Sequence, residues 1–187
     1  MNSSGKTGAA GCGPDGGESR EAFNYLGTHW AAHGYITVFP THPGSDRKAI
    51  AEQGLRGMGG VKDFHLRPED VHFVLDKLLS DDPGSQLVQG RLAADQIAVA
   101  GQCAGASTAL AMVGLRANLP EKKNATFVDP RFKCAIALSP QPGGGRASPL
   151  YAESWARITV PTLMVTGTRD FNWLPAARAN PNLARLP

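Results

Sequence analysis

The sequence has few cysteines and no long apolar run. Cys12, Cys103 and Cys134 have neither the even number of a disulfide framework nor the spacing of zinc ligands, so we expect no disulfide and no metal site. The N-terminal residues lack the apolar segment of a signal peptide, and no later run approaches the length of a membrane span. These absences predict a cytoplasmic protein in a reducing compartment, without a membrane anchor and without a cofactor.

Charge is also sparse. The formal net charge of +3 is spread over 187 residues, and the densest basic spot is the pair Lys122 and Lys123 beside Glu121. No basic stripe marks a surface for nucleic acid or for an anionic membrane, so we expect neither as a partner. The length suits one domain with a substantial core.

The N-terminal stretch is rich in glycine, serine and alanine. Residues 1 to 18 contain almost no large apolar side chains, and such a composition does not repay the entropy lost on ordering. We predict a flexible arm over residues 1 to 18 and a folded domain over residues 19 to 187.

Beyond the arm, short apolar runs with β propensity alternate with helical patterns. Strands are predicted over residues 35–39, 97–100, 134–138 and 162–166, and helices over residues 19–33, from Pro68 onward and up to about residue 115. This alternation is typical of the α/β class, in which helices cover both faces of a parallel sheet. Functional groups in such sheets gather at the carboxyl ends of strands, where His42, Cys103 and Asp170 fall.

A Gly-x-Cys-x-Gly motif joins the second of these strands, residues 97–100, to the Ala-rich helix that follows it. Gly101 and Gly105 leave room for a sharp turn, with Cys103 exposed at its tip as in a nucleophile elbow. The N–H groups and dipole of the following helix favour the thiolate, and the N–H of Ala104 can face a developing oxyanion. The alternative is a buried strand that merely turns closely into a helix, but the strand and helix on either side favour the elbow.

A cysteine nucleophile needs a histidine to carry protons and an acid to orient that histidine. Asp170 follows a buried strand and fits the acid, but a solvated loop aspartate that caps a turn is an equally good interpretation. The histidines, at positions 29, 33, 42, 65 and 72, all precede Cys103. We interpret four of them as surface or packing residues, whereas His42 can line a pocket or act as a substitute base.

Six segments together resemble the dienelactone-hydrolase-like branch of the α/β-hydrolases, the group that also holds bacterial polyester and platelet-activating-factor-type acyl hydrolases. They are SREAFNYLGTHWAAHGY, VFPTHPGSD, RPEDVHFVLDKL, QIAVAGQCAGASTALAMVG, FKCAIALSP and ITVPTLMVTGTRD, within about residues 16 to 171. The resemblance implies a three-layer sandwich with a mainly parallel sheet, and hydrolysis of a small carboxylic ester or lactone. It also implies Cys103 as nucleophile, Asp170 as acid, the backbone of Ala104 as the first oxyanion donor, and a second donor near Asp15 and Gly16.

The sequence departs from this family in three ways. Gln102 and Cys103 stand where most members have His-Ser, so thiol chemistry replaces serine chemistry. No histidine follows Asp170, and the Gly-rich arm stands where the family has the strand next to the elbow strand. We therefore expect a domain that lacks both ends of its parent, with a sheet that either breaks or recruits the arm. Two functions stay open, namely a thiol-dependent ester hydrolase and a catalytically incomplete or non-catalytic relative.

Overall fold

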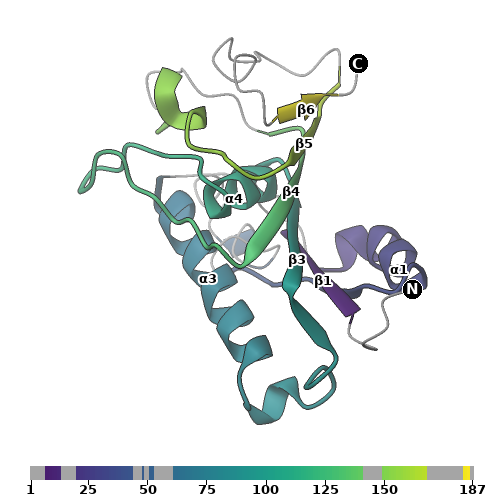
Figure 1. Ribbon diagram of the computed structural model, residues 1–187. Helices are drawn as coiled ribbons and strands as arrows, with labels where there is room; N and C mark the ends of the chain where they lie inside the picture. Colours follow the sequence, from purple (N-terminus) through teal and green to yellow (C-terminus); the bar gives the residue numbers. More distant parts are fainter. Residues whose placement is uncertain are drawn as a thin grey trace.

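The computed structural model describes residues 7–13, 20–43, 48, 51–52, 61–140, 149–167 and 183–185. Its strands are β1 (Thr7–Gly13), β2 (Ile36–Val38), β3 (Leu92–Gln102), β4 (Phe132–Leu138), β5 (Thr162–Val165) and β6 (Leu183–Arg185). Its helices are α1 (Asn24–Ala32), α3 (Val61–Leu79) and α4 (Ala104–Met112), with short 3-10 turns η1 (Arg20–Phe23), η3 (Pro83–Ser85) and η4 (Ala152–Trp155). Figure 1 shows the strands as a twisted sheet between α1 on one side and α3 and α4 on the other.

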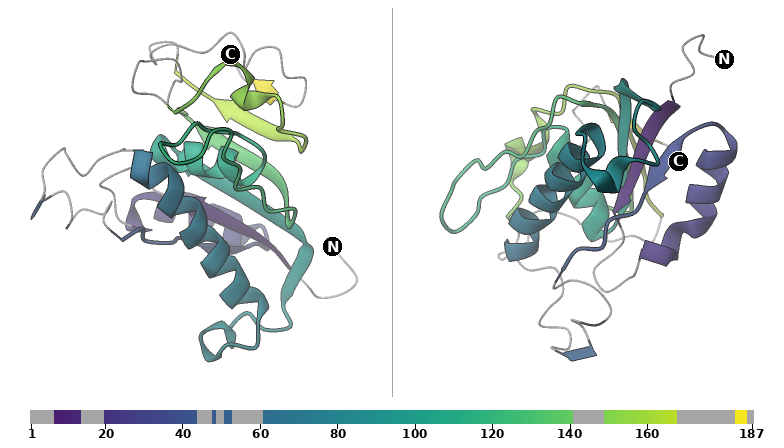
Figure 2. Two further views of the ribbon diagram at one scale, coloured as in Figure 1. Left: turned by 90° about the vertical axis from the view of Figure 1, so that its left-hand side faces the viewer. Right: turned by 90° about the horizontal axis from the view of Figure 1, so that it is seen from below.

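The strands form one sheet in the order β2-β1-β3-β4-β5-β6, and every pairing between neighbours is parallel. The two further views in Figure 2 show helices on both faces of this sheet. The predicted α/β class with a parallel, doubly covered sheet is therefore confirmed. None of the described helices combines the length and the apolar character needed to cross a membrane.

β3 separates two hydrophobic cores. Its Ile97 and Val99 belong to a large core with residues of α3 and α4, whereas the next residue, Ala100, joins a smaller core with Phe23 on the α1 side. Successive side chains of a strand point to opposite faces of a sheet, so this alternation places β3 in the middle layer of three.

The N-terminal arm contributes the strand that fills the predicted gap. β1 lies between β2 and β3 and pairs with both, so that Ala9 stands opposite Ile36 on one side and Ile97 on the other. Backbone N–H and C=O groups at an open gap would lack partners, and this cost outweighs the low β propensity of glycine and alanine. The prediction of a flexible arm is wrong for Thr7–Gly13, and the alternative that the arm supplies a strand is confirmed. Residues 1–6 and 14–18 lie outside the described residues.

Gly8 in β1 also matches the narrow space between the neighbouring segments. A Cβ on Gly8 would lie 2.9 Å from the carbonyl oxygen of Gln96 and 3.1 Å from the ring of Tyr35. A larger side chain at this position would push the two flanking strands apart. The composition that argued against a strand is therefore what allows this one to fit.

Three further expectations need correction. Pro68 lies inside α3 instead of opening it, because its fully buried ring packs well enough to compensate for the helical hydrogen bond that proline cannot donate. β2 is half-buried rather than buried on both faces, because it ends the sheet and has one neighbouring strand. The last strand predicted from the sequence covers residues 162–166, but β6 pairs with β5 and continues the sheet.

Arg131, just before β4, links the buried carboxylate of Asp129 to Asp76 on α3. Arg131 donates to both carboxylate oxygens of Asp129, with Nε at 2.9 and 3.0 Å, and reaches Asp76 on α3 at 2.6 Å. Burial alone would raise the pKa of Asp129, but the hydrogen bonds and charge of Arg131, together with the charge of His72, outweigh it and lower that pKa. Asp129 is therefore ionised in the folded protein well into the acidic range.

We expect Asp129→Asn to lower the free energy of unfolding by about 2 kcal/mol at neutral pH, because the amide cannot accept the same charge-assisted hydrogen bonds. The folded-state pKa of Asp129 lies below its ordinary value of 3.8, so the carboxylate contributes stability above that value and loses it as the pH falls through the folded-state pKa. The difference between wild type and variant should therefore vanish in strong acid. Urea unfolding at a series of pH values measures it.

Asp76→Asn is the matched control, because Asp76 binds the same arginine with a side chain that is 66% exposed. Its loss should cost less than about 0.5 kcal/mol, as is usual for exposed ion pairs. Equal destabilisation by the two variants at every pH would contradict the role assigned to Asp129.

Candidate active site

Cys103 stands between β3 and α4 in a backbone conformation that cysteine seldom adopts. Its φ is 49° and its ψ is −112°, outside the helical and extended regions. Such a residue costs on the order of 1–3 kcal/mol and persists only where its surroundings enforce it. The predicted sharp turn from strand to helix, with cysteine at its tip, is the conformation that the structure has.

Gly101 lets the start of α4 fold back onto the end of β3. A Cβ on Gly101 would lie 2.1 Å from the carbonyl oxygen of Gly105 and 2.8 Å from the backbone nitrogen of Ala106. Backbone thus packs on backbone at the turn, and the first glycine of the motif leaves the space for it. Every residue of α4 is buried, so the helix cannot move away to accommodate a side chain.

Backbone hydrogen bonds hold the turn on both sides. The N–H of Cys103 donates to the carbonyl of Leu138 at the end of β4, at 2.9 Å. The carbonyl of Cys103 accepts from the N–H of Ser107 at 3.2 Å, and the Thr108 hydroxyl donates to the carbonyl of Ala104 at 3.1 Å. The strained residue is therefore fixed to a neighbouring strand and to the first turn of α4.

The surroundings of the two described thiols differ. Cys103 and Cys134 are both half-buried and neither forms a disulfide. Cys103 precedes the first turn of α4, where N–H groups without helical partners and the helix dipole favour negative charge. Cys134 lies inside β4, and burial raises the pKa of its thiol. Of these two, Cys103 is the one whose position favours reaction as a thiolate.

The described residues contain part of the predicted site. Ala104 is the first residue of α4, as its predicted role as an oxyanion donor requires. Asp170, Asp15 and Gly16 lie outside the described residues. His42 is 3% exposed after the end of β2, and its Nδ1 lies 2.8 Å from a carboxylate oxygen of Asp70 on α3.

Two further residues at this edge of the sheet were not predicted from the sequence. Asp70 pairs with His42 across 28 positions of the chain, a separation at which no sequence signal links them. Ser139 follows β4 with a φ of 45° and donates its N–H to Val165 at the end of β5. The Ser-Pro pair after an apolar run was the available signal, since it favours a turn.

The remaining histidines lie on helices. His29 and His33 are exposed on and just after α1, as predicted, with ring centroids 4.4 Å apart. His65 and His72 lie on α3, within 3.6 Å of Glu69 and 3.7 Å of Asp129. Within the described ranges, no three histidine, cysteine or acidic side chains are grouped to hold a metal ion.

Comparison with known proteins assigns neither a family nor a function to this chain. No protein-family model matches the sequence, and no curated protein matches it.

We expect Gly101→Ala to destabilise the protein by about 3 kcal/mol, because the added methyl group overlaps the backbone of a helix that is buried throughout. Gly34→Ala is the control, since Gly34 has a φ of 85° with nothing within 4 Å of an added Cβ. That variant pays the conformational cost of about 1–2 kcal/mol without a steric clash. Thermal unfolding compares the two, and a smaller loss for Gly101→Ala than for Gly34→Ala would contradict the close packing at the turn.

Cys103 should be alkylated faster than Cys134 by at least about tenfold near neutral pH, because Cys103 directly precedes a helix N-terminus whereas burial raises the pKa of Cys134. The measurement is the rate of iodoacetamide labelling of each peptide by mass spectrometry, in a Cys12→Ser background. Gly101→Ala should slow the labelling of Cys103, whereas Gly34→Ala should leave it unchanged. Equal rates for Cys103 and Cys134 at every pH would remove the argument for an activated thiol.

Proposed function

We propose that this protein is a thiol-dependent hydrolase of carboxylic esters or lactones, with Cys103 as the nucleophile. The observation that carries the proposal is the positive φ of Cys103, at a sharp turn between a parallel strand and a buried helix. A strained residue held at the carboxyl edge of a parallel sheet is where a nucleophile elbow presents its side chain. The strain, the small-residue packing and the adjacent helix N-terminus all concern the same residue.

We also propose that the sheet is that of an α/β-hydrolase of the dienelactone-hydrolase-like branch. β1 occupies the place next to the elbow strand where this family has its third strand. Helices on both faces and the elbow after β3 support the same architecture. The small ester or lactone substrate and the reducing, cytoplasmic setting belong to this proposal, because a thiol nucleophile needs reducing conditions to stay active.

The proposed reaction has two steps. The Cys103 thiolate attacks the carbonyl carbon, a carbon–sulfur bond forms, and the carbon–oxygen bond to the leaving alkoxide breaks. The N–H of Ala104 stabilises the negative charge on the carbonyl oxygen during this attack. Water then cleaves the thioester, and the acid and the thiol are released. With an activated ester the first step needs no general acid, because the thiolate is strongly nucleophilic and the leaving group is stable as an anion.

The second step is where this chain differs from a complete triad. The five histidines of the printed sequence all precede Cys103, so the imidazoles that these residues offer for activating water lie earlier in the chain. His42 is the histidine at the carboxyl edge of the sheet, and its contact with Asp70 resembles the pairing of a base with an orienting acid. Its near-complete burial favours a structural role. The second candidate function is therefore a relative that can be acylated but does not turn over.

We expect a burst of about one product per protein with p-nitrophenyl acetate, followed by a steady rate at least about 100-fold slower, because the near-complete burial of His42 keeps its imidazole from activating water for deacylation. Stopped-flow absorbance measures the burst, and intact-protein mass spectrometry detects the acetyl group. Cys103→Ala should abolish both signals. Acetylation spread over other residues in this variant, with an unchanged burst, would overturn the role of Cys103.

His42→Gln and Cys134→Ser complete the design. A steady rate that continues in wild type and Cys134→Ser, but is lost in both Cys103→Ala and His42→Gln, would identify His42 as the base and contradict its structural role. Circular dichroism of His42→Gln must match that of wild type, because the same substitution removes a buried contact.

A further inference from the structure

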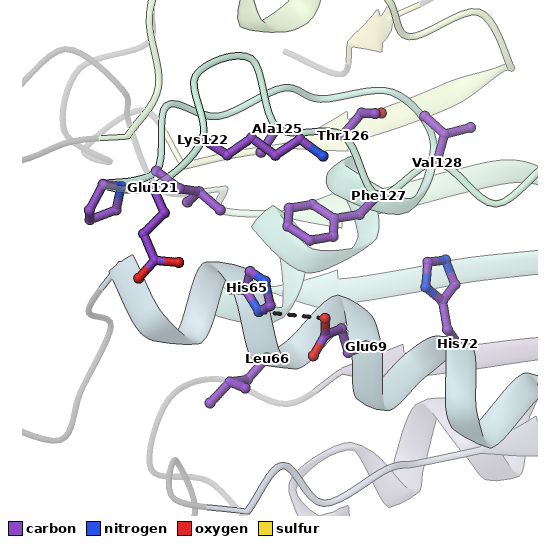
Figure 3. A pocket seen from close by; sticks show the side chains of 12 residues that line it. His65, Leu66, Glu69, His72, Glu121, Lys122, Ala125, Thr126, Phe127 and Val128 are labelled. Atoms are coloured by element: carbon purple, nitrogen blue, oxygen red, sulfur yellow. Dashed lines mark ion pairs between the residues drawn. The ribbon is translucent and has the colours of Figure 1, made fainter.

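A cavity lies apart from the elbow, between α3 and the connection that leads from α4 to β4. Its volume is about 820 Å³, within the range of small-molecule sites. Figure 3 shows α3 along one side and the connecting chain along the other, with side chains from both directed into the space between them. None of its lining residues belongs to β3, to the elbow or to α4.

Both walls of this cavity are formed before any ligand arrives. On α3, His65, Glu69 and His72 are spaced to share one face of the helix. The opposite wall is closed by an antiparallel bridge between Ala117 and Ala125, with backbone bonds of 2.8 and 3.2 Å. Ligand binding to such a site costs little ordering of the chain.

The cavity has an apolar interior. Leu119 and Ala125 are buried parts of the main core, and the ring of Phe127 packs against the same core. The ring of His65 stands edge-on to Phe127, with centroids 5.7 Å apart. Leu66 and Val128, which are 49% and 48% exposed, extend the apolar lining outward. A flat or chain-like apolar group could therefore contact the buried residues at the base of the cavity and the exposed apolar residues at its margin.

The charges of the lining are unequal. Glu69 and Glu121 carry two carboxylates, against one ammonium on Lys122 and the imidazoles of His65 and His72, which carry charge only when protonated. In Figure 3 the ring of His65 lies between the carboxylates of Glu121 and Glu69, and the Glu69 carboxylate is 3.6 Å from that ring. Phe127 adds an aromatic face, which also attracts positive charge. The balance favours a cation over an anion.

We infer that this cavity binds a small amphipathic organic cation, an amine with an aromatic or aliphatic tail. The ammonium group lies near Glu69 and Glu121 and donates to their carboxylates, while the tail covers Phe127 and the buried floor. The inference does not depend on the proposed hydrolase activity, because the elbow shares no residue with the cavity.

The test is a matched pair of probes, 4-phenylbutylamine and 4-phenylbutanoate, which have similar tails and opposite charges. Titration into the full chain, followed by calorimetry and by ¹H–¹⁵N chemical shifts, should show binding of the amine, with shifts confined to α3 and residues 119–128. The carboxylate should bind at least about threefold more weakly, as expected for exposed charge interactions.

Substitutions at three charged lining residues test whether carboxylates strengthen amine binding and the lysine weakens it. Glu69→Gln combined with Glu121→Gln should weaken amine binding by about tenfold, whereas Lys122→Gln should strengthen it, because it removes the lysine that opposes the ligand. Glu153→Gln is the matched control, since Glu153 is exposed on η4 outside the cavity. All four residues are exposed, so unchanged thermal unfolding is expected and checks that the fold is kept.

The proposal fails if the carboxylate binds as well as the amine, or if neither probe shifts the cavity residues at millimolar concentration. It also fails if Glu153→Gln weakens binding as much as the double substitution does. Cys103→Ala should leave amine binding unchanged, so the outcome at the cavity and the outcome at the elbow can be separated.

Discussion

The fold depends on a strand of small residues, β1, whose backbone pairs with both β2 and β3. Both flanking strands present N–H and C=O groups that must find partners in a covered sheet, and β1 supplies them on both of its edges. Gly8 leaves room for Gln96 and Tyr35 on the two sides of β1, and α4 contacts β1 as well as β3 and β4. Removing β1 would therefore expose the strand that leads to Cys103.

The same use of small residues continues at the elbow. Gly101 allows the backbone of α4 to pack directly on the end of β3, and the Ala-rich sequence of the helix lets it be buried along its whole length. Close packing of this kind allows few alternative positions, so the backbone of Cys103 is held in its strained conformation. The reactivity proposed for the thiol thus originates in packing that extends well beyond the turn.

The elbow and the cavity beside α3 are built on different principles. The elbow is dominated by backbone geometry, whereas the cavity is an apolar hollow with a few charged side chains at its margin. α3 connects the two regions, because Asp70 contacts His42 near the carboxyl edge of the sheet while Glu69, the adjacent residue, faces the cavity. A ligand that shifts α3 would therefore also move Asp70 relative to His42, although the elbow and the cavity share no lining residue.

Local patterns in the sequence were enough to predict the α/β class, the central strands and the strand–turn–helix around Cys103. Those features depend on short-range periodicity and on glycine spacing, which act within a few residues. The role of Thr7–Gly13 could not be predicted in the same way, because a Gly/Ala strand forms only when two other strands offer it hydrogen bonds on both sides. The pairing of His42 with Asp70 and the cavity between α3 and residues 119–128 likewise join parts of the chain that are distant in sequence. Only the tertiary structure decided them, because long-range contacts follow from how the layers pack and leave no periodic trace in the sequence.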